Sequence, residues 1–95
     1  MEVEQVHLKN GTALGIKIEI NVAPLLVIKT GKGFVMCGYL NIEAAEKMGD
    51  VAAKVSGVRN FEDVLNAKVN ALTSKAKDLG VKEGMTGREA LEMML

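Results

Sequence analysis

The chain has 95 residues, a length typical of one domain with a single core. Twelve basic side chains balance twelve acidic ones, which argues against a domain that binds nucleic acid through its phosphates. Hydrophobic residues make up 48% of the chain and charged residues 25%, which is typical of a folded domain and not of a disordered one. We therefore expect a single domain over residues 1–95 with no nucleic-acid partner.

The sequence also argues against a membrane or secreted protein. The longest apolar run, residues 22–28, contains Pro24 and is far shorter than the roughly 20 residues of a membrane-spanning helix. The start of the chain is acidic, with Glu2 and Glu4, and no signal peptide is visible. A single cysteine allows no internal disulfide, which fits a reducing compartment. We expect a cytoplasmic protein without a membrane partner.

The first 40 residues predict a meander of antiparallel strands. Apolar residues occupy every second position from Leu14 to Ile20, which is typical of a strand with one buried and one wet face. Asn10-Gly11 predicts a type I′ hairpin turn just upstream, which makes residues 3–9 the partner strand. Pro24 fits only the start of a strand that continues through residues 25–28.

The next segment predicts a tight turn followed by a central strand. Residues 30–33 read Thr-Gly-Lys-Gly, but they lack the spacing of a phosphate-binding loop and lead into a strand, so they favour a hairpin turn. Residues 34–37 show no polar alternation, which indicates a strand covered on both faces.

Beyond residue 42 the pattern becomes mainly helical. Asn41 and Gly49 are placed as the N-cap and the C-terminal stop of a helix over residues 42–48. Residues 51–55 alternate again and predict a fifth strand, and Asn60 is placed to cap a second short helix.

The last third of the chain predicts two more helices. An apolar stripe over residues 69–79 predicts a helix that ends at Gly80, although residues 67–72 could instead form an edge strand. Thr86 and Glu89 have the spacing of a capping box at the start of a final helix. The expected fold class is α+β, a mainly antiparallel sheet of four to five strands with three to four helices, mostly in the C-terminal half.

Three segments resemble a known family. They are GFVMCGYLN at residues 33–41, GVRNFEDVL at residues 57–65 and AKDLGVKEGMTGREAL at residues 76–91. These segments resemble the YunC-like family, a small domain of unknown function found in bacteria and archaea, over most of the chain from Pro24 onward. Asn41 departs from the family, where Asp is frequent. The resemblance implies a compact cytoplasmic domain and supplies no activity and no catalytic residue.

Cys37 is the candidate catalytic nucleophile. It lies at the end of an apolar strand and would need a nearby cation, base or helix N-terminus to ionise, for which Arg59 and His7 are available. The alternative is a small buried hydrophobic side chain, which is the usual state of a free cysteine. His7 is the only histidine, and no spacing suits a zinc site, so no metal and no cofactor are predicted.

The two arginines suggest a site for a small anionic ligand. Arg59 precedes one predicted helix and Arg88 lies in the first turn of another, where helix N-termini already favour anions. Thr86 and Gly87 would allow such a group to approach closely, so the candidate ligand-binding residues are Arg59, Thr86, Gly87 and Arg88. The alternative is an ordinary capping box with Arg88 paired to Glu92.

The sequence favours a non-enzymatic binding or assembly module. One histidine, one cysteine, no paired carboxylates and no metal spacing leave little for catalysis. High aliphatic content without net charge favours self-association as a homodimer or larger. The alternative is a small enzyme or redox-sensitive domain that uses Cys37, with an arginine holding an anionic ligand.

Overall fold

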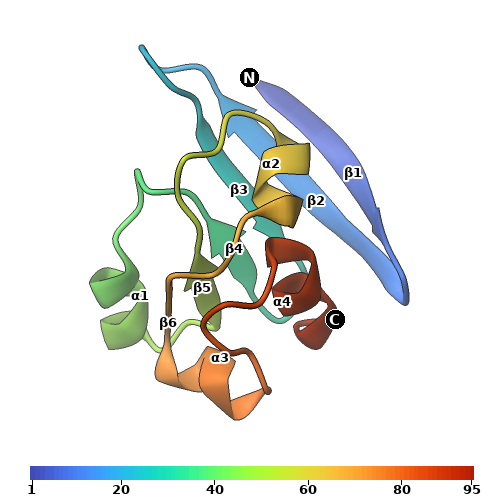
Figure 1. Ribbon diagram of the computed structural model, residues 1–95, viewed down its shortest axis with the longest axis vertical. Helices are drawn as coiled ribbons and strands as arrows, with labels where there is room; N and C mark the ends of the chain where they lie inside the picture. Colours follow the sequence, from blue (N-terminus) through green and yellow to red (C-terminus); the bar gives the residue numbers. More distant parts are fainter.

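One sheet organises the computed structural model, which describes residues 1–95 (Figure 1). Its six strands lie side by side in chain order, and every neighbouring pair is antiparallel except β4 and β5, which are parallel. The strands are β1 (Glu2–Leu8), β2 (Gly11–Ile18), β3 (Leu25–Lys29), β4 (Phe34–Met36), β5 (Ala52–Lys54) and β6 (Ala71–Leu72). The helices are α1 (Ile42–Met48), α2 (Phe61–Asn66), α3 (Ser74–Asp78) and α4 (Gly87–Met93). The predicted α+β class is confirmed, but the sheet has one strand more than predicted and is mixed.

The parallel pair follows from α1. The side chain of Asn41 accepts hydrogen bonds from the backbone N–H groups of Glu43 and Ala44, and Gly49 ends the helix with a φ of +78°. Both caps were predicted from the sequence. Because α1 carries the chain back to the end of the sheet where β4 began, β5 runs in the same direction as β4. Alternation in residues 51–55 indicates a strand but contains no information on its direction.

The turn between β1 and β2 differs from the prediction. Leu8 pairs with Gly11, so Lys9 and Asn10 form the loop, and neither Asn10 nor Gly11 has a positive φ. The type I′ turn is therefore wrong, although the hairpin itself is present. Contacts from the C-terminal segment accompany this turn: the Lys9 N–H donates to the Glu92 carboxylate at 3.1 Å, and a Cβ on Gly11 would touch the Leu95 side chain.

The helix predicted over residues 69–79 is shorter than its apolar stripe. Residues 71–72 form β6, which confirms the edge-strand alternative for part of residues 67–72, and α3 starts only at Ser74. Thr73 explains the boundary, since its buried hydroxyl accepts the N–H groups of Ala52 and Ala76 and donates to the Asp50 carbonyl. None of the four helices has the length and apolar character needed to cross a membrane.

Helices α2 and α4 cover the inner face of the sheet and form the main core with it. The ring of Phe61 lies against Gly15 of β2, where a Cβ would come within 2.7 Å of it. Gly87 allows α4 to approach α2 closely, because a Cβ there would collide with the Val64 carbonyl. The fully buried members of this core are Leu26, Ile28, Val35, Ala53, Val55, Val64, Ala76, Val81, Ala90, Leu91 and Met94.

Strand β2 has the predicted alternation, with its large apolar side chains on the outside. Ala13 is buried on the inner face, while Leu14 and Ile18 lie on the outer face and remain exposed. The inner positions hold small residues because Phe61 needs the space above Gly15. As a result, the apolar stripe of β2 faces away from the core.

Candidate functional site

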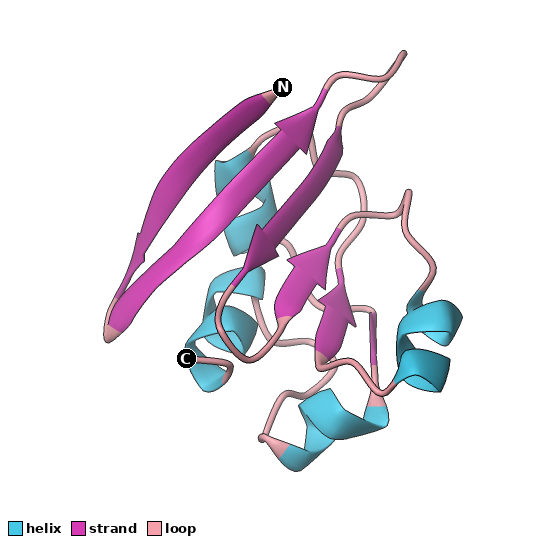
Figure 2. Cartoon of the chain, turned by 180° about the vertical axis from the view of Figure 1, so that it is seen from behind, coloured by secondary structure: helices cyan, strands magenta, loops and turns pink.

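The outer face of the sheet is covered over only part of its width. Helix α1 packs on β4 and β5, where Ala45 of the helix meets Met36 and Ala52 of the strands. Figure 2 shows the same sheet from behind, and no helix lies in front of β1, β2 and β3. The sheet is therefore closed by helices on both sides at β4 and β5 and on one side at β1–β3.

The uncovered part of this face is apolar, and we call it the bare face. Its side chains are Val3, Leu14, Ile16, Ile18 and Val27. One row runs through Val3, Ile16 and Val27 to Met36, and exposure falls along it from 55% at Val3 to 2% at Met36, where α1 begins to cover the sheet. Beyond the end of β2, exposed Ile20 and Val22 add further apolar surface.

Few polar groups interrupt the bare face. Among the charged residues of β1–β3, only Lys29 lies on the outer side, in register with Leu14, while Gln5 and His7 lie toward the hairpin end of β1. Lys17, Glu2 and Glu4 point to the inner side instead, and Lys17 forms an ion pair with Glu19 at 3.4 Å. A contiguous apolar patch on a small protein is typical of a surface that contacts another macromolecule.

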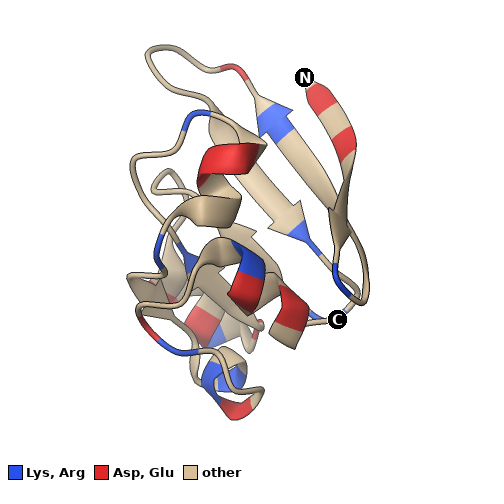
Figure 3. Ribbon diagram, turned by 45° about the vertical axis from the view of Figure 1, so that its right-hand side comes forward, with Lys and Arg blue, Asp and Glu red and all other residues tan.

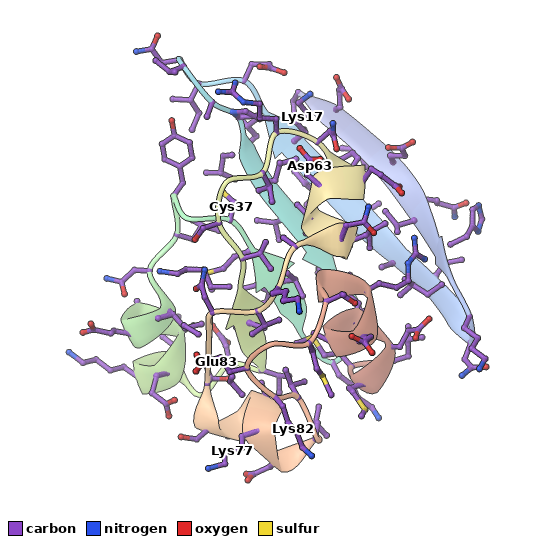
Figure 4. The ribbon with its side chains drawn as sticks, viewed as in Figure 1. Lys17, Cys37, Asp63, Lys77, Lys82 and Glu83 are labelled. Carbon is purple, nitrogen blue, oxygen red and sulfur yellow. The ribbon has the colours of Figure 1, made fainter.

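Cys37 lies at the end of β4, and its side chain is only 3% exposed. Its Sγ accepts a hydrogen bond from the Leu26 N–H at 3.3 Å. It also lines a pocket of about 240 Å³ with Ala23, Pro24, Gly38, Tyr39, Gly57 and Val58. This pocket lies where the parallel strands β4 and β5 end, which is where open α/β sheets bind ligands. In Figure 4 Cys37 is well apart from Lys77, Lys82 and Glu83, the labelled residues around α3.

Arg59 lies beside this pocket, next in the chain to Val58. Its guanidinium donates to the carbonyl of Val22 at 3.5 Å, and its backbone N–H donates to the Asp63 carboxylate at 3.0 Å. Asp63 also lies in the first turn of α2, where its N–H donates to the predicted cap, Asn60. The structure therefore places Arg59 next to a hollow whose wall contains the buried thiol of Cys37, but Arg59 does not itself line that hollow.

The other three ligand-binding candidates lie elsewhere. Thr86 forms the predicted capping box, with its hydroxyl accepting the Glu89 N–H and the Glu89 carboxylate accepting the Thr86 N–H. Gly87 is buried against α2, so the space that it leaves is filled by Val64. Neither Thr86 nor Gly87 lines a pocket. Glu92, the predicted alternative partner of Arg88, accepts a hydrogen bond from the Lys9 N–H.

Arg88 lines a groove of about 400 Å³ between β1 and α2. The charged side chains in that groove are Glu2, Glu4, Glu62, Lys17 and Arg88, together with His7. Figure 3 shows acidic residues on both β1 and α2, the two elements that the groove separates. Three carboxylates against two cations disfavour an anion beside Arg88, and the other candidate arginine, Arg59, lies at a different hollow.

Two further features limit the chemistry available. The hollow beside α3, about 350 Å³, is lined by two lysines and two glutamates, Lys77, Lys82, Glu46 and Glu83, whose charges balance. No three of the His, Cys, Asp and Glu side chains come together as a metal site.

The bare face was not singled out from the sequence. The small residues Ala13 and Gly15 were the available signal, because they mark the side of β2 on which another element packs closely.

The fold defines a class: a small α+β domain with one mixed sheet, two helices on its inner face and an outer face that is half covered. The chain belongs to the family described as a domain of unknown function, DUF1805, whose profile matches residues 36–94. It is 33% identical over 84 residues to the uncharacterized protein YunC of Bacillus subtilis (strain 168), covering 84% of this chain and 83% of that protein. The resemblance to the YunC-like family is confirmed.

A solved structure shares the whole fold. The crystal structure of a protein of unknown function, TA1206 from Thermoplasma acidophilum, superposes with a TM-score of 0.93 at 34% identity. The superposition covers 99% of this chain and 92% of that one. None of these relatives carries an assigned activity in its description.

Proposed function

We propose that this protein is a non-enzymatic assembly module of the cytoplasm that binds another protein surface through the bare face. The observation that carries the proposal is the row from Val3 to Met36, in which one continuous apolar stripe is buried under α1 at one end and exposed at the other. Exposed β-branched and leucine side chains in such a row cost free energy in water, and contact with a second surface removes that cost.

Two features support the proposal over a catalytic role. The bare face has few charged groups, as the central part of a protein interface does. The groups available for chemistry are dispersed, since Cys37 lies in one hollow while Arg88 and His7 line another. The single free thiol of Cys37 is compatible with a reducing cytoplasm.

The proposal is tested in the cells from which the gene comes. A tagged chain expressed at its natural level should elute from a gel-filtration column in a complex larger than one chain. The Leu14→Ser variant should shift to the size of one chain, because it places a hydroxyl in the bare face. Leu79→Ser is the matched control, since Leu14 and Leu79 are each 37% exposed and Leu79 lies beside α3. Wild type eluting as one chain, or both variants behaving alike, would contradict the proposal.

A second candidate function is favoured by the Cys37 pocket. A thiol in the wall of a hollow at the ends of two parallel strands, with Arg59 beside it, is the arrangement that a cysteine-based or redox-sensitive site with an anionic ligand would use. Thiol labelling distinguishes the two candidates. An assembly module in which Cys37 only fills space should react slowly when folded and quickly in denaturant. Fast labelling of the folded protein near pH 6, slowed by inorganic phosphate, would favour the second candidate.

A further inference from the structure

We infer that the surface bound by the bare face is the bare face of a second copy of this chain. In the inferred dimer the two sheets pack face to face around a two-fold axis that runs along β2 above Ile16, and α1 of each copy lies beside the β1 edge of the other. This inference rests on the proposed function and specifies its partner and geometry.

The area of the bare face suits a second copy. A specific interface buries at least about 1,000 Å² in total, which is about 500 Å² from each of two copies. The exposed fractions of the bare face, with Ile20 and Val22, correspond to roughly 500 Å² of apolar surface, at the upper end for a patch on a monomer. The bare face has a single charge at its border, Lys29, so it has no charge pattern that would select a charged partner. An apolar face of this kind can pack against an identical face of a second copy.

Helix α1 determines the direction of the axis. It rises from the outer face over β4 and β5, filling the layer in which a packed sheet would lie about 10 Å above the strands. An axis across the strands would place the α1 helices of both copies over the same strands, in a gap with room for one layer. An axis along β2 instead moves the α1 of the second copy to the far side, next to β1.

The strand spacing brings that helix to the β1 edge. Helix α1 contacts β4 and β5, two to three strands from β2 and therefore roughly 10–15 Å to one side of the axis at about 4.8 Å per strand. The rotation places the second copy's α1 at the same distance on the other side, level with the first sheet and just beyond β1. An open seven-residue edge strand is thereby covered by a helix, which is one of the ways in which proteins protect sheet edges.

Pairing of two β1 edges is the main competing geometry, and the sequence of β1 opposes it. Glu2 and Glu4 both point to the inner side of the sheet, where they line the groove beside α2. Inward-pointing charges on an edge strand disfavour its extension by another strand. On the outer side of β1, Val3 continues the apolar row of the bare face.

The first experiment measures the mass of the purified chain by light scattering over a micromolar concentration range. We expect the mass of a dimer. Leu14→Ser should weaken association at least tenfold, because each dimer loses two leucine side chains from the interface. Leu79→Ser should leave it unchanged, and circular dichroism checks that both variants are folded.

The second experiment locates the axis by cross-linking in a Cys37→Ala background. Packed sheets hold facing Cα atoms too far apart for a disulfide, so the probe is a short bismaleimide. Ile16→Cys should cross-link efficiently because Ile16 lies on the axis. Val3→Cys alone should not, since Val3 faces the second copy's Val27, and the double variant Val3→Cys/Val27→Cys should cross-link.

Each outcome decides between the geometries. A purified chain that stays monomeric overturns the second copy as partner, while the complex in native cells continues to test the assembly function separately. A dimer that tolerates Leu14→Ser and cross-links through Gln5→Cys, but not through Ile16→Cys, overturns face-to-face packing in favour of paired edges. If the single Val3→Cys variant cross-links as efficiently as the single Ile16→Cys variant, the axis does not run along β2.

Discussion

The two halves of the sheet differ in how many layers cover them. At β4 and β5 the sheet lies between α1 on one side and the core under α2 and α4 on the other, and the strand residues Val35, Met36, Ala52 and Ala53 are almost completely buried. At β1–β3 only the inner side is covered, and the outer side is the bare face (Figure 2). The difference shows that α1 ends the buried region part of the way across a continuous apolar row, and the remainder of that row is where we place a partner.

The two halves also read differently in the sequence. Residues 34–37 have no polar alternation, which correctly predicted a strand covered on both faces. Residues 13–19 alternate, which correctly predicted that one face would be buried, but the large side chains were those left outside. Alternation therefore shows that the two faces of a strand differ, but it does not show which face is buried. That depends on which face the neighbouring helix packs against.

The largest effect should come from separating α2 and α4, the layer that both halves share. Gly87→Ala forces a Cβ against the Val64 carbonyl, so α2 and α4 must move apart. We expect the free energy of unfolding, measured in urea, to fall by about 3 kcal/mol. Gly31→Ala is the control, because a Cβ there meets nothing within 4 Å and its φ is not positive. Equal stabilities of the two variants would contradict the close contact between α2 and α4.

A pair of valines sharpens the comparison between the halves. Val35→Ala in the doubly covered half removes a fully buried side chain and should destabilise the fold by about 2 kcal/mol. Val3→Ala on the bare face should cost less than about 0.5 kcal/mol at protein concentrations low enough to keep the chain monomeric. Urea denaturation of both variants gives the comparison. A large cost for Val3→Ala under these conditions would show that the bare face is covered within the monomer.

The cap of α4 should contribute less than either core effect. Thr86→Ala removes the oxygen that accepts the Glu89 N–H, and the free energy of unfolding should fall by about 1 kcal/mol. Thr86→Ser retains a hydroxyl and should change stability little. Both variants can be compared with wild type by thermal or urea unfolding, and identical stabilities of all three proteins would contradict the cap.

The smallest expected effect is a pH dependence from the same cap. The Thr86 N–H, and then the Thr86 hydroxyl, hold the pKa of the Glu89 carboxyl below its ordinary value. Because the pKa is lower in the folded state, the contribution is fully present above the unfolded pKa and is lost as pH falls through the folded pKa. The stability difference between wild type and Glu89→Gln should therefore be constant near neutral pH and change only in acid. Denaturation at several pH values measures it.

The helix starts were the most predictable part of the structure. Asn41, Asn60 and Thr86 all cap the helices that the sequence assigned to them. A cap depends on a side chain and a backbone N–H two or three residues away, so local sequence is sufficient to recognise it. The start of the helix predicted over residues 69–79 was less predictable, because pairing of Asn70 and Thr73 with β5 replaced the helical hydrogen bonds there.

The candidate site was predictable only in part. Cys37 lines one pocket and Arg59 follows another of its lining residues, Val58, in the chain. Arg88 lies in an acidic groove, and Thr86 and Gly87 serve the capping and packing of α4. Each residue type suits an anionic ligand when considered by itself. Whether such residues meet depends on long-range contacts, here the approach of β1 to α2 and of α4 to α2.

By itself, the sequence determined the family, the α+β class, most strand and helix positions and the three caps, because these depend on periodicity and on contacts between residues close in the chain. The tertiary structure alone decided that β5 runs parallel to β4, that the β1–β2 turn is formed by Lys9 and Asn10, and that Leu14, Ile16 and Ile18 face outward. The outward direction of those side chains follows from the packing of Phe61 against Gly15, which joins segments far apart in the chain. The parallel direction of β5 follows from the packing of α1, the connection between β4 and β5, on the outer face of those two strands. A strand with two different faces is compatible with either side inward until such a contact is made.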